Sequence, residues 1–309
     1  MKVAYLFPGQ GSQRVGMLQQ LPAHPIIAAT LAEASQILSE NVLLFDSEKA
    51  LKSTRAVQLA LLTIEVALGR LLQGEGAISN MVAGHSVGAF AAAVIADSLS
   101  FSQALSVVNL RGRLMEEAYP KEYGMAVVTG LDEKTVGLLT QRVLGREPVY
   151  VANINAPDQI TIAGSQQGLE EVCALAREGG AQKIQYVNIS VPSHCCLLQP
   201  VAHALMTKLS AMTVKDGVIP YIGNCRARAL RRGEDVRNDL ALGVAQSVRW
   251  HDMTNLLVEL GTTLFIEVGP GQVLTTMVMK AFPTVRAMAL ENSGFSSARI
   301  LVQREQRKE

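Results

Sequence analysis

The sequence predicts an α/β fold in which helices flank a mostly parallel sheet. Strand-like apolar runs alternate with helical runs over residues 1 to about 122, and the same alternation resumes after about residue 195. Such alternation is typical of parallel sheets covered by helices. Between these stretches the order of elements changes, which indicates an inserted subdomain. With 309 residues and 49% hydrophobic side chains, the chain is long and apolar enough to bury a large core.

The first stretch opens with a short apolar strand that ends at Pro8-Gly9. Its predicted elements are a strand at 2–7, helices near 26–40 and 56–73, a strand near 78–83, and helices at 89–96 and 101–118.

The middle stretch has a different rhythm. Its predicted elements are a strand at 125–129, a helix at 132–143, strands at 149–154 and 160–163, a helix at 167–178 and a strand at 183–189. The order β-α-β-β-α-β is the ferredoxin-like signature. We therefore expect residues 124–190 to form a small ferredoxin-like subdomain, inserted into a large α/β subdomain made of residues 1–123 and 191–309.

The last stretch returns to the first pattern. Its predicted elements are a helix at 195–209, a strand at 219–223, helices at 237–247 and 251–260, a strand at 264–268, and then a helix and a terminal strand. The charge run at 304–309 predicts a solvated tail.

Composition excludes several classes of function. A formal net charge of +1 gives no electrostatic basis for nucleic-acid binding. No uninterrupted apolar stretch is long enough to span a membrane, and the apolar run at the N-terminus is too short for a signal peptide. The four cysteines form no Cys-x-x-Cys pair, and the nearby His194 and His203 complete no zinc pattern, so we expect no metal site. Reduced thiols in a cytoplasmic protein are the simplest interpretation.

Residues 84–88, Gly-His-Ser-Val-Gly, lie between a predicted strand and a small-residue helix. Strand, Gly-x-Ser-x-Gly and helix form the nucleophile elbow of hydrolase-like α/β sheets, which makes Ser86 the candidate nucleophile. The N-terminus of the following helix favours a developing oxyanion. The alternative is a Gly/Ser turn that only packs a helix on a strand.

A nucleophilic serine needs a base, and the chain has five histidines. His194 is favoured because it follows a predicted strand at the seam between the subdomains, where clefts form. His203 is the second candidate, and a structural histidine is the alternative for each. His85 neighbours the serine, but adjacent side chains at an elbow diverge, so we expect it to serve packing.

Arg111 falls on the apolar face of the predicted helix 101–118. An inward arginine is costly unless a carboxylate or phosphate meets it. One interpretation is an ion pair with an internal Asp or Glu. The other is a fork for a substrate carboxylate, which a guanidinium binds with two hydrogen bonds.

The first strand leads into residues 7–13, Phe-Pro-Gly-Gln-Gly-Ser-Gln. Loops at the carboxyl ends of parallel strands build sites, so this loop and the elbow are expected side by side. The backbone N–H groups of Gln10 and Val87 would then form an oxyanion hole. An ordinary Gly-rich turn is the alternative, and the lack of a following Gly-Lys-Ser/Thr excludes a P-loop.

Together these motifs, with Val-Pro-Ser-His at 191–194 and Glu-Val-Gly-Pro-Gly at 267–271, occur in the order found in malonyl-CoA:acyl carrier protein transacylases. The chain resembles this family over residues 1 to about 290. The resemblance implies that Ser86 is the nucleophile, His194 its base and Arg111 the partner of the malonyl carboxylate. It also implies oxyanion-hole roles for Gln10 and Val87. Pocket-lining roles are implied for Gln58, Asn153 and Asn155.

The chain departs from that family at two places. Relatives in fatty-acid synthesis commonly carry Gly-Glu-Tyr after the elbow, where this chain has Gly88-Ala89-Phe90. The glutamine whose backbone carbonyl orients the histidine aligns with Gly243, which retains a backbone acceptor. With these departures the chain looks most like the epsilon subunit of malonate decarboxylase.

The resemblance implies malonyl transfer from malonyl-CoA, through a seryl ester, to the phosphopantetheine-type thiol of a carrier protein, for which the carrier subunit of malonate decarboxylase is expected. It implies no metal or redox cofactor. The alternatives are a malonyl transacylase of fatty-acid or polyketide synthesis, a serine thioesterase or hydrolase such as a patatin-like lipase, and a non-catalytic carrier-binding subunit. The basic cluster Arg226–Arg232 is either a solvated loop or a docking patch for an acidic carrier or the CoA phosphates.

Overall fold

The computed structural model describes residues 2–119, 121–187 and 189–307, and two sheets organise them. The larger sheet has the strand order β10-β9-β1-β2-β7-β8, and every pair is parallel except β7 with β8. Its strands are β1 (Lys2–Phe7), β2 (Met81–Gly84), β7 (Tyr221–Ile222), β8 (Ala229–Leu230), β9 (Thr262–Glu267) and β10 (Arg286–Ala289). The mostly parallel α/β sheet predicted from the sequence is confirmed.

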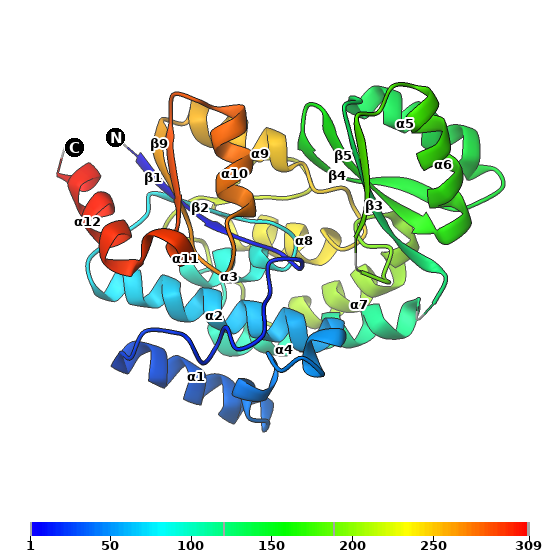
Figure 1. The fold of residues 1–309 in the computed structure, drawn as a ribbon. Coiled ribbons are helices and arrows are strands. Elements are labelled where there is room, and N and C mark those ends of the chain that lie inside the picture. Colours follow the sequence, from blue (N-terminus) through cyan, green and yellow to red (C-terminus); the bar gives the residue numbers. More distant parts are fainter. Residues whose placement is uncertain (1, 120, 188, 308–309) are drawn as a thin grey trace.

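Helices cover both faces of this sheet, so its central strand β1 is buried on both sides (Figure 1). Val3, Tyr5 and Phe7 point to one face, and Ala4 and Leu6 point to the other. The first face is covered by α1 (Pro25–Leu38), α2 (Thr54–Gly74), α3 (Gly88–Ile95), α4 (Phe101–Ala118), α7 (Gln199–Ser210), α8 (Gly233–Leu242) and α12 (Phe295–Gln306). The second is covered by α9 (Trp250–Glu259) and α10 (Val273–Ala281).

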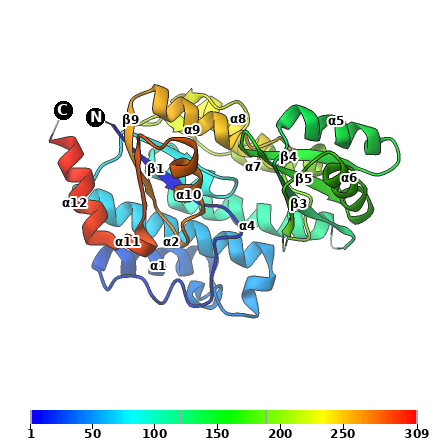
Figure 2. The same cartoon turned by 45° about the horizontal axis from the view of Figure 1, so that its top comes forward.

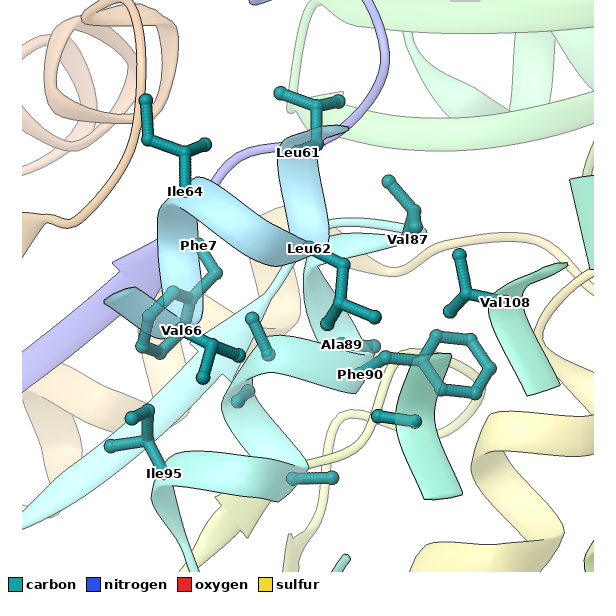
Figure 3. Packing of buried hydrophobic residues seen from close by; sticks show 14 of the residues in the cluster. Phe7, Leu61, Leu62, Ile64, Val66, Val87, Ala89, Phe90, Ile95 and Val108 are labelled. Carbon is teal, nitrogen blue, oxygen red and sulfur yellow. The ribbon is translucent and has the colours of Figure 1, made fainter. Parts of the chain in front are cut away.

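The helix that follows the elbow is buried against its neighbours. Figure 3 shows side chains of α2, α3 and α4 in one cluster, with Leu62, Phe90 and Val108 near the start of α3. Small residues along α3 allow this close packing. The cluster fixes the direction in which α3 leaves the elbow, and therefore the place of the residues just before it.

Helix α2 is the one described helix whose length and apolar composition would suffice to cross a membrane. Its most apolar window is 89% buried inside the protein. It is a core helix.

The smaller sheet is antiparallel, with the order β4-β5-β3-β6. Its elements follow the chain order β-α-β-β-α-β. They are β3 (Tyr123–Thr129), α5 (Glu133–Leu144), β4 (Val149–Ala156), β5 (Gln159–Ser165), α6 (Gln166–Glu178) and β6 (Lys183–Val187). This small subdomain has its own hydrophobic core. It lies at one end of the molecule in both views, and α12 lies at the other (Figures 1 and 2).

The C-terminal region differs from the expectation. After β10 the chain forms a short helix, α11 (Leu290–Ser293), and then α12, which the sequence analysis did not predict. The expected solvated tail is wrong for Glu305, which is fully buried and pairs with Arg286 of β10. Tertiary packing therefore orders a charged segment whose composition suggested solvent.

Three short 3-10 helices complete the described elements, at Val42–Leu44, Ala50–Lys52 and Cys196–Leu198. Helix α8 begins and ends earlier than predicted. It spans Gly233–Leu242 instead of 237–247. Beyond its last residue, the carbonyl groups of Gly243 and Val244 accept hydrogen bonds from His194 instead of from a further helical turn.

Candidate active site

Ser86 lies on a sharp turn between β2 and α3, with a φ of 56°. A Cβ on Gly84 would come within 2.1 Å of the carbonyl of Gly88, and a Cβ on Gly88 within 2.2 Å of the carbonyl oxygen of Phe7. Both positions therefore require glycine. The turn that the sequence predicts from Gly-x-Ser-x-Gly is present, with the serine in the left-handed conformation that nucleophile elbows impose.

His194 lies against Ser86. Its Nε2 is 2.8 Å from Ser86 Oγ, and its Nδ1 is 2.6 Å from the carbonyl oxygen of Gly243. A carbonyl only accepts, so Nδ1 carries the proton and Nε2 is left to accept from the serine hydroxyl. The backbone N–H of His194 donates to the carbonyl of Val244 at 2.8 Å. Two successive carbonyls thus hold the ring and the backbone of one residue.

Burial and, to a smaller extent, the positive charge of Arg111 together lower the pKa of His194 to about 3, although the hydrogen bond to Gly243 opposes this shift. The imidazole is therefore neutral at pH 7, the form that accepts a proton. Burial also lowers the pKa of Arg111, to about 10, which leaves its guanidinium charged.

Arg111 comes from α4 and is 2% exposed. Its Nη1 donates to Gln58 Oε1 at 2.6 Å, and its Nη2 donates to Ser86 Oγ at 3.2 Å. Within the described residues its guanidinium has no carboxylate within 4 Å. The described structure therefore contains no internal ion pair for Arg111, and a buried cation faces the nucleophile with neutral partners only.

A small cavity of about 40 Å³ brings most of the predicted site residues together. It is lined by Gln10, Gln58, His85, Ser86, Val87, Arg111, Met115, Met125, Asn153, Ile189, Ser193 and His194. The Oδ1 of Asn153 is buried and has no hydrogen-bond partner in the described part of the chain. It is an acceptor available to a ligand.

Asn155 does not line this cavity, contrary to the expectation. Its Oδ1 lies 3.3 Å from His85 Nε2, and its Nδ2 donates to Thr161 Oγ1 at 3.2 Å. Its side chain thus contacts His85, which itself lines the cavity. A larger cavity of about 640 Å³, between α5, β4 and α9, contains none of the predicted site residues.

The other histidines have local roles. His85 packs against Trp250 with ring centroids 5.5 Å apart, and His24 accepts a hydrogen bond from Ile26 N as the cap of α1. His203 is exposed on α7. His251 stacks on Phe282. None of these four contacts Ser86 Oγ in the described structure.

The segment 243–249 connects His194 to the small subdomain. Besides holding His194, it pairs with β4: the N–H of Val248 donates to Ala152 O at 2.9 Å, and Ile154 N donates back to Val248 O at 2.9 Å. This pairing fixes the backbone on both sides of Asn153. The segment 243–249 therefore positions both His194 and the part of β4 that carries Asn153 to the cavity.

Sequence analysis missed Asn224, whose side chain binds the backbone of Ser86. A signal was available, because Asn224 follows the predicted strand at 219–223, and the carboxyl ends of parallel strands build sites. Nothing in its local sequence marks its contact with a serine 138 residues away.

The chain is similar to known proteins along almost its whole length. A model of the "Acyl transferase domain" family matches residues 4–308. The malonyl CoA-acyl carrier protein transacylase of Escherichia coli O157:H7 is 35% identical over 96% of this chain and 97% of its own length. That of Bacillus subtilis is 35% identical over 94% of each chain.

Solved structures agree with these sequence matches. The crystal structure of FabD from Acinetobacter baumannii superposes with a TM-score of 0.93 at 36% identity, over 98% of this chain and 99% of that one. A malonyl-transacylase solved with a type II PKS acyl-carrier protein gives a TM-score of 0.92 at 32% identity. The superposition covers 99% of this chain and 100% of that one. Fold, motifs and coverage agree, and the chain belongs to the acyl transferase family, in its group of malonyl CoA-acyl carrier protein transacylases.

Proposed function

We propose that the protein transfers a malonyl group from malonyl-CoA to the thiol of an acyl carrier protein. The observation that carries this proposal is the position of Arg111, a buried cation 3.2 Å from Ser86 Oγ with no carboxylate partner in the described structure. A malonyl group places its carboxylate carbon only two bonds from the reacting carbonyl. A guanidinium in contact with the nucleophile therefore suits this short acyl group.

The first half-reaction uses the hydroxyl of Ser86. His194 Nε2 takes its proton as Oγ attacks the thioester carbonyl, and the backbone N–H groups of Gln10 and Val87 receive the oxyanion. The C–S bond then breaks, and CoA leaves as its thiol with the proton from His194. The product is a malonyl ester of Ser86.

The second half-reaction reverses these steps with another thiol. The phosphopantetheine-type thiol of the carrier gives its proton to His194 and attacks the ester. Oγ leaves and regains the proton, so the enzyme returns to its starting state. This sequence needs no metal or redox cofactor, and we place it in the cytoplasm, where the four free cysteines would stay reduced.

Arg111 supplies the selectivity in this scheme. The malonyl carboxylate accepts two charge-assisted hydrogen bonds from the guanidinium, while an acetyl group leaves the buried cation without an anionic partner. Gln58 holds the guanidinium at 2.6 Å and so fixes its plane toward Ser86. Asn153 offers a further acceptor or donor to the acyl group or the pantetheine arm.

For the carrier, the relatives named above favour the acyl carrier protein of fatty-acid or polyketide synthesis. The dedicated carrier subunit of malonate decarboxylase is the second candidate, which the variant sequence after the elbow favours. Ala89 and Phe90, in place of Glu-Tyr, are 4% and 2% exposed and line a small space beside Ser86 and Arg111. Parallel transfer assays with the two carriers, at equal concentrations, separate these candidates.

The test of the activity is the intact mass of the protein after mixing with malonyl-CoA. We expect a mass increase of one malonyl group, lost again when a carrier thiol is added. Rapid release of free malonate without a carrier would instead indicate a thioesterase. The absence of any adduct would favour a non-catalytic carrier-binding subunit.

A further inference from the structure

The side-chain amide of Asn224 bridges the two sides of the elbow. Its Nδ2 donates to the carbonyl oxygen of Gly84 at 2.9 Å, and its Oδ1 accepts from the backbone N–H of Ser86 at 3.1 Å. Asn224 is 3% exposed. Both hydrogen bonds are therefore shielded from water.

This pair of bonds continues the parallel sheet beyond its last strand residues. Strand β7 pairs with β2 through Tyr221 with Val82 and Ile222 with Ala83, and then ends. In a parallel ladder, the residue opposite His85 would donate its backbone N–H to the carbonyl of residue 84 and accept with its own carbonyl from the N–H of residue 86. The amide of Asn224 makes these two bonds. A side-chain amide thus takes the place of the backbone N–H and carbonyl of a strand residue, at the point where the chain bends to expose Ser86.

Asn224 is itself held on both sides. Its N–H donates to Asp239 Oδ2 at 2.9 Å, and its carbonyl accepts from Arg249 N at 3.0 Å. Asp239, from α8, also accepts from the hydroxyl of Tyr221 at 2.7 Å and from Cys225 N at 2.9 Å. Burial and the nearby Asp239 raise the pKa of Tyr221, so its hydroxyl remains a donor. The amide therefore has a fixed orientation.

We propose that Asn224 is a positioning residue for the nucleophile, with Asp239 as its support. Ser86 has a φ of 56°, which non-glycine residues adopt rarely, and the amide of Asn224 holds both flanks of that turn. It also occupies the N–H of Ser86, which leaves the N–H of Val87 as the elbow's donor to the oxyanion. Loss of the amide would leave a buried N–H unpaired and release Oγ from His194 and Arg111.

This inference rests on the proposed function, because positioning matters only if Ser86 is the nucleophile. The main test is Asn224→Ala, followed by the rate of malonyl-serine formation from malonyl-CoA in single turnovers. We expect the maximal rate to fall about 100-fold, as misplacement of a reacting group does, with the KM for malonyl-CoA nearly unchanged. A structural role alone would lower the melting temperature and leave this rate in place.

A matched control lies at the other end of the same strand. Asn80 Oδ1 accepts from Val3 N at 2.8 Å, so Asn80→Ala removes a similar amide-to-backbone bond between β2 and its surroundings without touching the elbow. We expect it to lower the melting temperature while the rate of acylation stays within about threefold of wild type.

Asp239→Asn provides a second variant in case Asn224→Ala does not fold. It keeps the size of the side chain but replaces one acceptor oxygen by an NH2 group, so either the N–H of Cys225 or the two donors that share Oδ2 lose their acceptor. We expect the maximal rate of malonyl-serine formation to fall less than in Asn224→Ala, again with the KM for malonyl-CoA nearly unchanged. If Asn224→Ala, or Asp239→Asn where only that variant folds, acylates as fast as Asn80→Ala, the proposal is overturned.

A second probe separates this proposal from the proposed function. Phenylmethylsulfonyl fluoride reacts with activated serines and needs neither CoA nor a carboxylate site. If wild type reacts with it at Ser86 but not with malonyl-CoA, the proposed function fails while the role of Asn224 remains testable by sulfonylation. If sulfonylation in the Asn224→Ala variant is as fast as in wild type, the positioning role fails.

Discussion

Arg111 and Ser86 are in direct contact: the guanidinium Nη2 lies 3.2 Å from the serine Oγ, and a neutral glutamine holds its other nitrogen. A buried cation beside a nucleophile is costly without an anion. The site is therefore incomplete until a carboxylate arrives. This relationship leads to the sharpest prediction on substrate choice.

Arg111→Ala should depress malonyl transfer far more than acetyl transfer. The malonyl carboxylate loses its partner, whereas acetyl-CoA loses little or gains, because the cation that opposed it is gone. The ratio of kcat/KM for malonyl-CoA and acetyl-CoA, measured with a thermal melt of the same variant, checks this. Equal losses for both substrates with a fold weakened by about 3–5 kcal/mol would point to a structural arginine instead.

Ser86→Ala should abolish the covalent malonyl adduct, since within the described site no other nucleophilic side chain contacts His194 Nε2. Intact-mass measurement after incubation with malonyl-CoA checks it. An adduct that persists would show that the elbow serine is not the nucleophile.

His194→Ala should slow both half-reactions by about 100- to 10,000-fold, the usual contribution of a general base. Single-turnover acylation and transfer to the carrier measure the two halves separately. His203→Ala is the control, because that histidine is exposed on α7. Normal rates in His194→Ala would remove it from the mechanism.

The pH dependence of Ser86 reactivity should lack the usual histidine limb. Burial and Arg111 lower the pKa of His194 to about 3, so the base stays neutral as pH falls through 6.5. The rate of sulfonylation by phenylmethylsulfonyl fluoride should be nearly flat between pH 7.5 and about 5 on this account. In Arg111→Ala the pKa of His194 should rise, because one of the causes that lower it is removed, and the fall of the rate in acid should begin at a higher pH. A wild-type limb centred near pH 6.5 would contradict the buried neutral base.

Stability should fall in acid for the same reason. The pKa values of His194 and His85 are lowered by burial to about 3 and about 4, while in the unfolded chain they return to the ordinary value. Between about pH 6.5 and pH 4 the unfolded state therefore binds more protons, and folding weakens as pH falls. Urea unfolding at several pH values should show this slope, and His194→Ala should reduce it. An unchanged slope in the variant would locate the titration elsewhere.

The basic loop offers a test of carrier docking. Arg226 and Arg228 are exposed, line a cavity of about 430 Å³, and have no ion-pair partner in the described part of the chain. Arg226→Glu with Arg228→Glu should raise the KM for the carrier, most strongly at low ionic strength. The same charge reversal at Arg304 and Arg307, at the C-terminal end of α12 and near the opposite edge of the large sheet, is the control. Equal KM values in both double variants would identify a solvated loop.

The sequence predicted the parts of the site that follow local rules. The elbow at Ser86 needs glycines at fixed offsets, and the inward face of α4 identifies Arg111 by helical periodicity. The support of Ser86 by Asn224 could not be predicted, because it is a side-chain contact between segments far apart in the chain. The resemblance implied a pocket-lining role for Asn155, and its contact with His85, 70 residues away in the chain, could not be predicted for the same reason.

The same division holds for the fold. Alternating strands and helices predicted the large sheet, and the distinct rhythm at 124–190 predicted the elements of the small one. The C-terminal helix α12 could not be predicted from local pattern, because its charges suggested solvent. Its place depends on burial of Ala298 and Val302 and on the pairing of Glu305 with Arg286.

The pairing of Val248 with β4 has a consequence for protein engineering. A chimera that exchanges residues 124–190 alone would set a foreign β4 against the resident segment 243–249, which also orients His194. The graft would then disturb the position of His194 even though neither Ser86 nor His194 was altered. The exchangeable module consists of both segments, and transplants between relatives should carry them together.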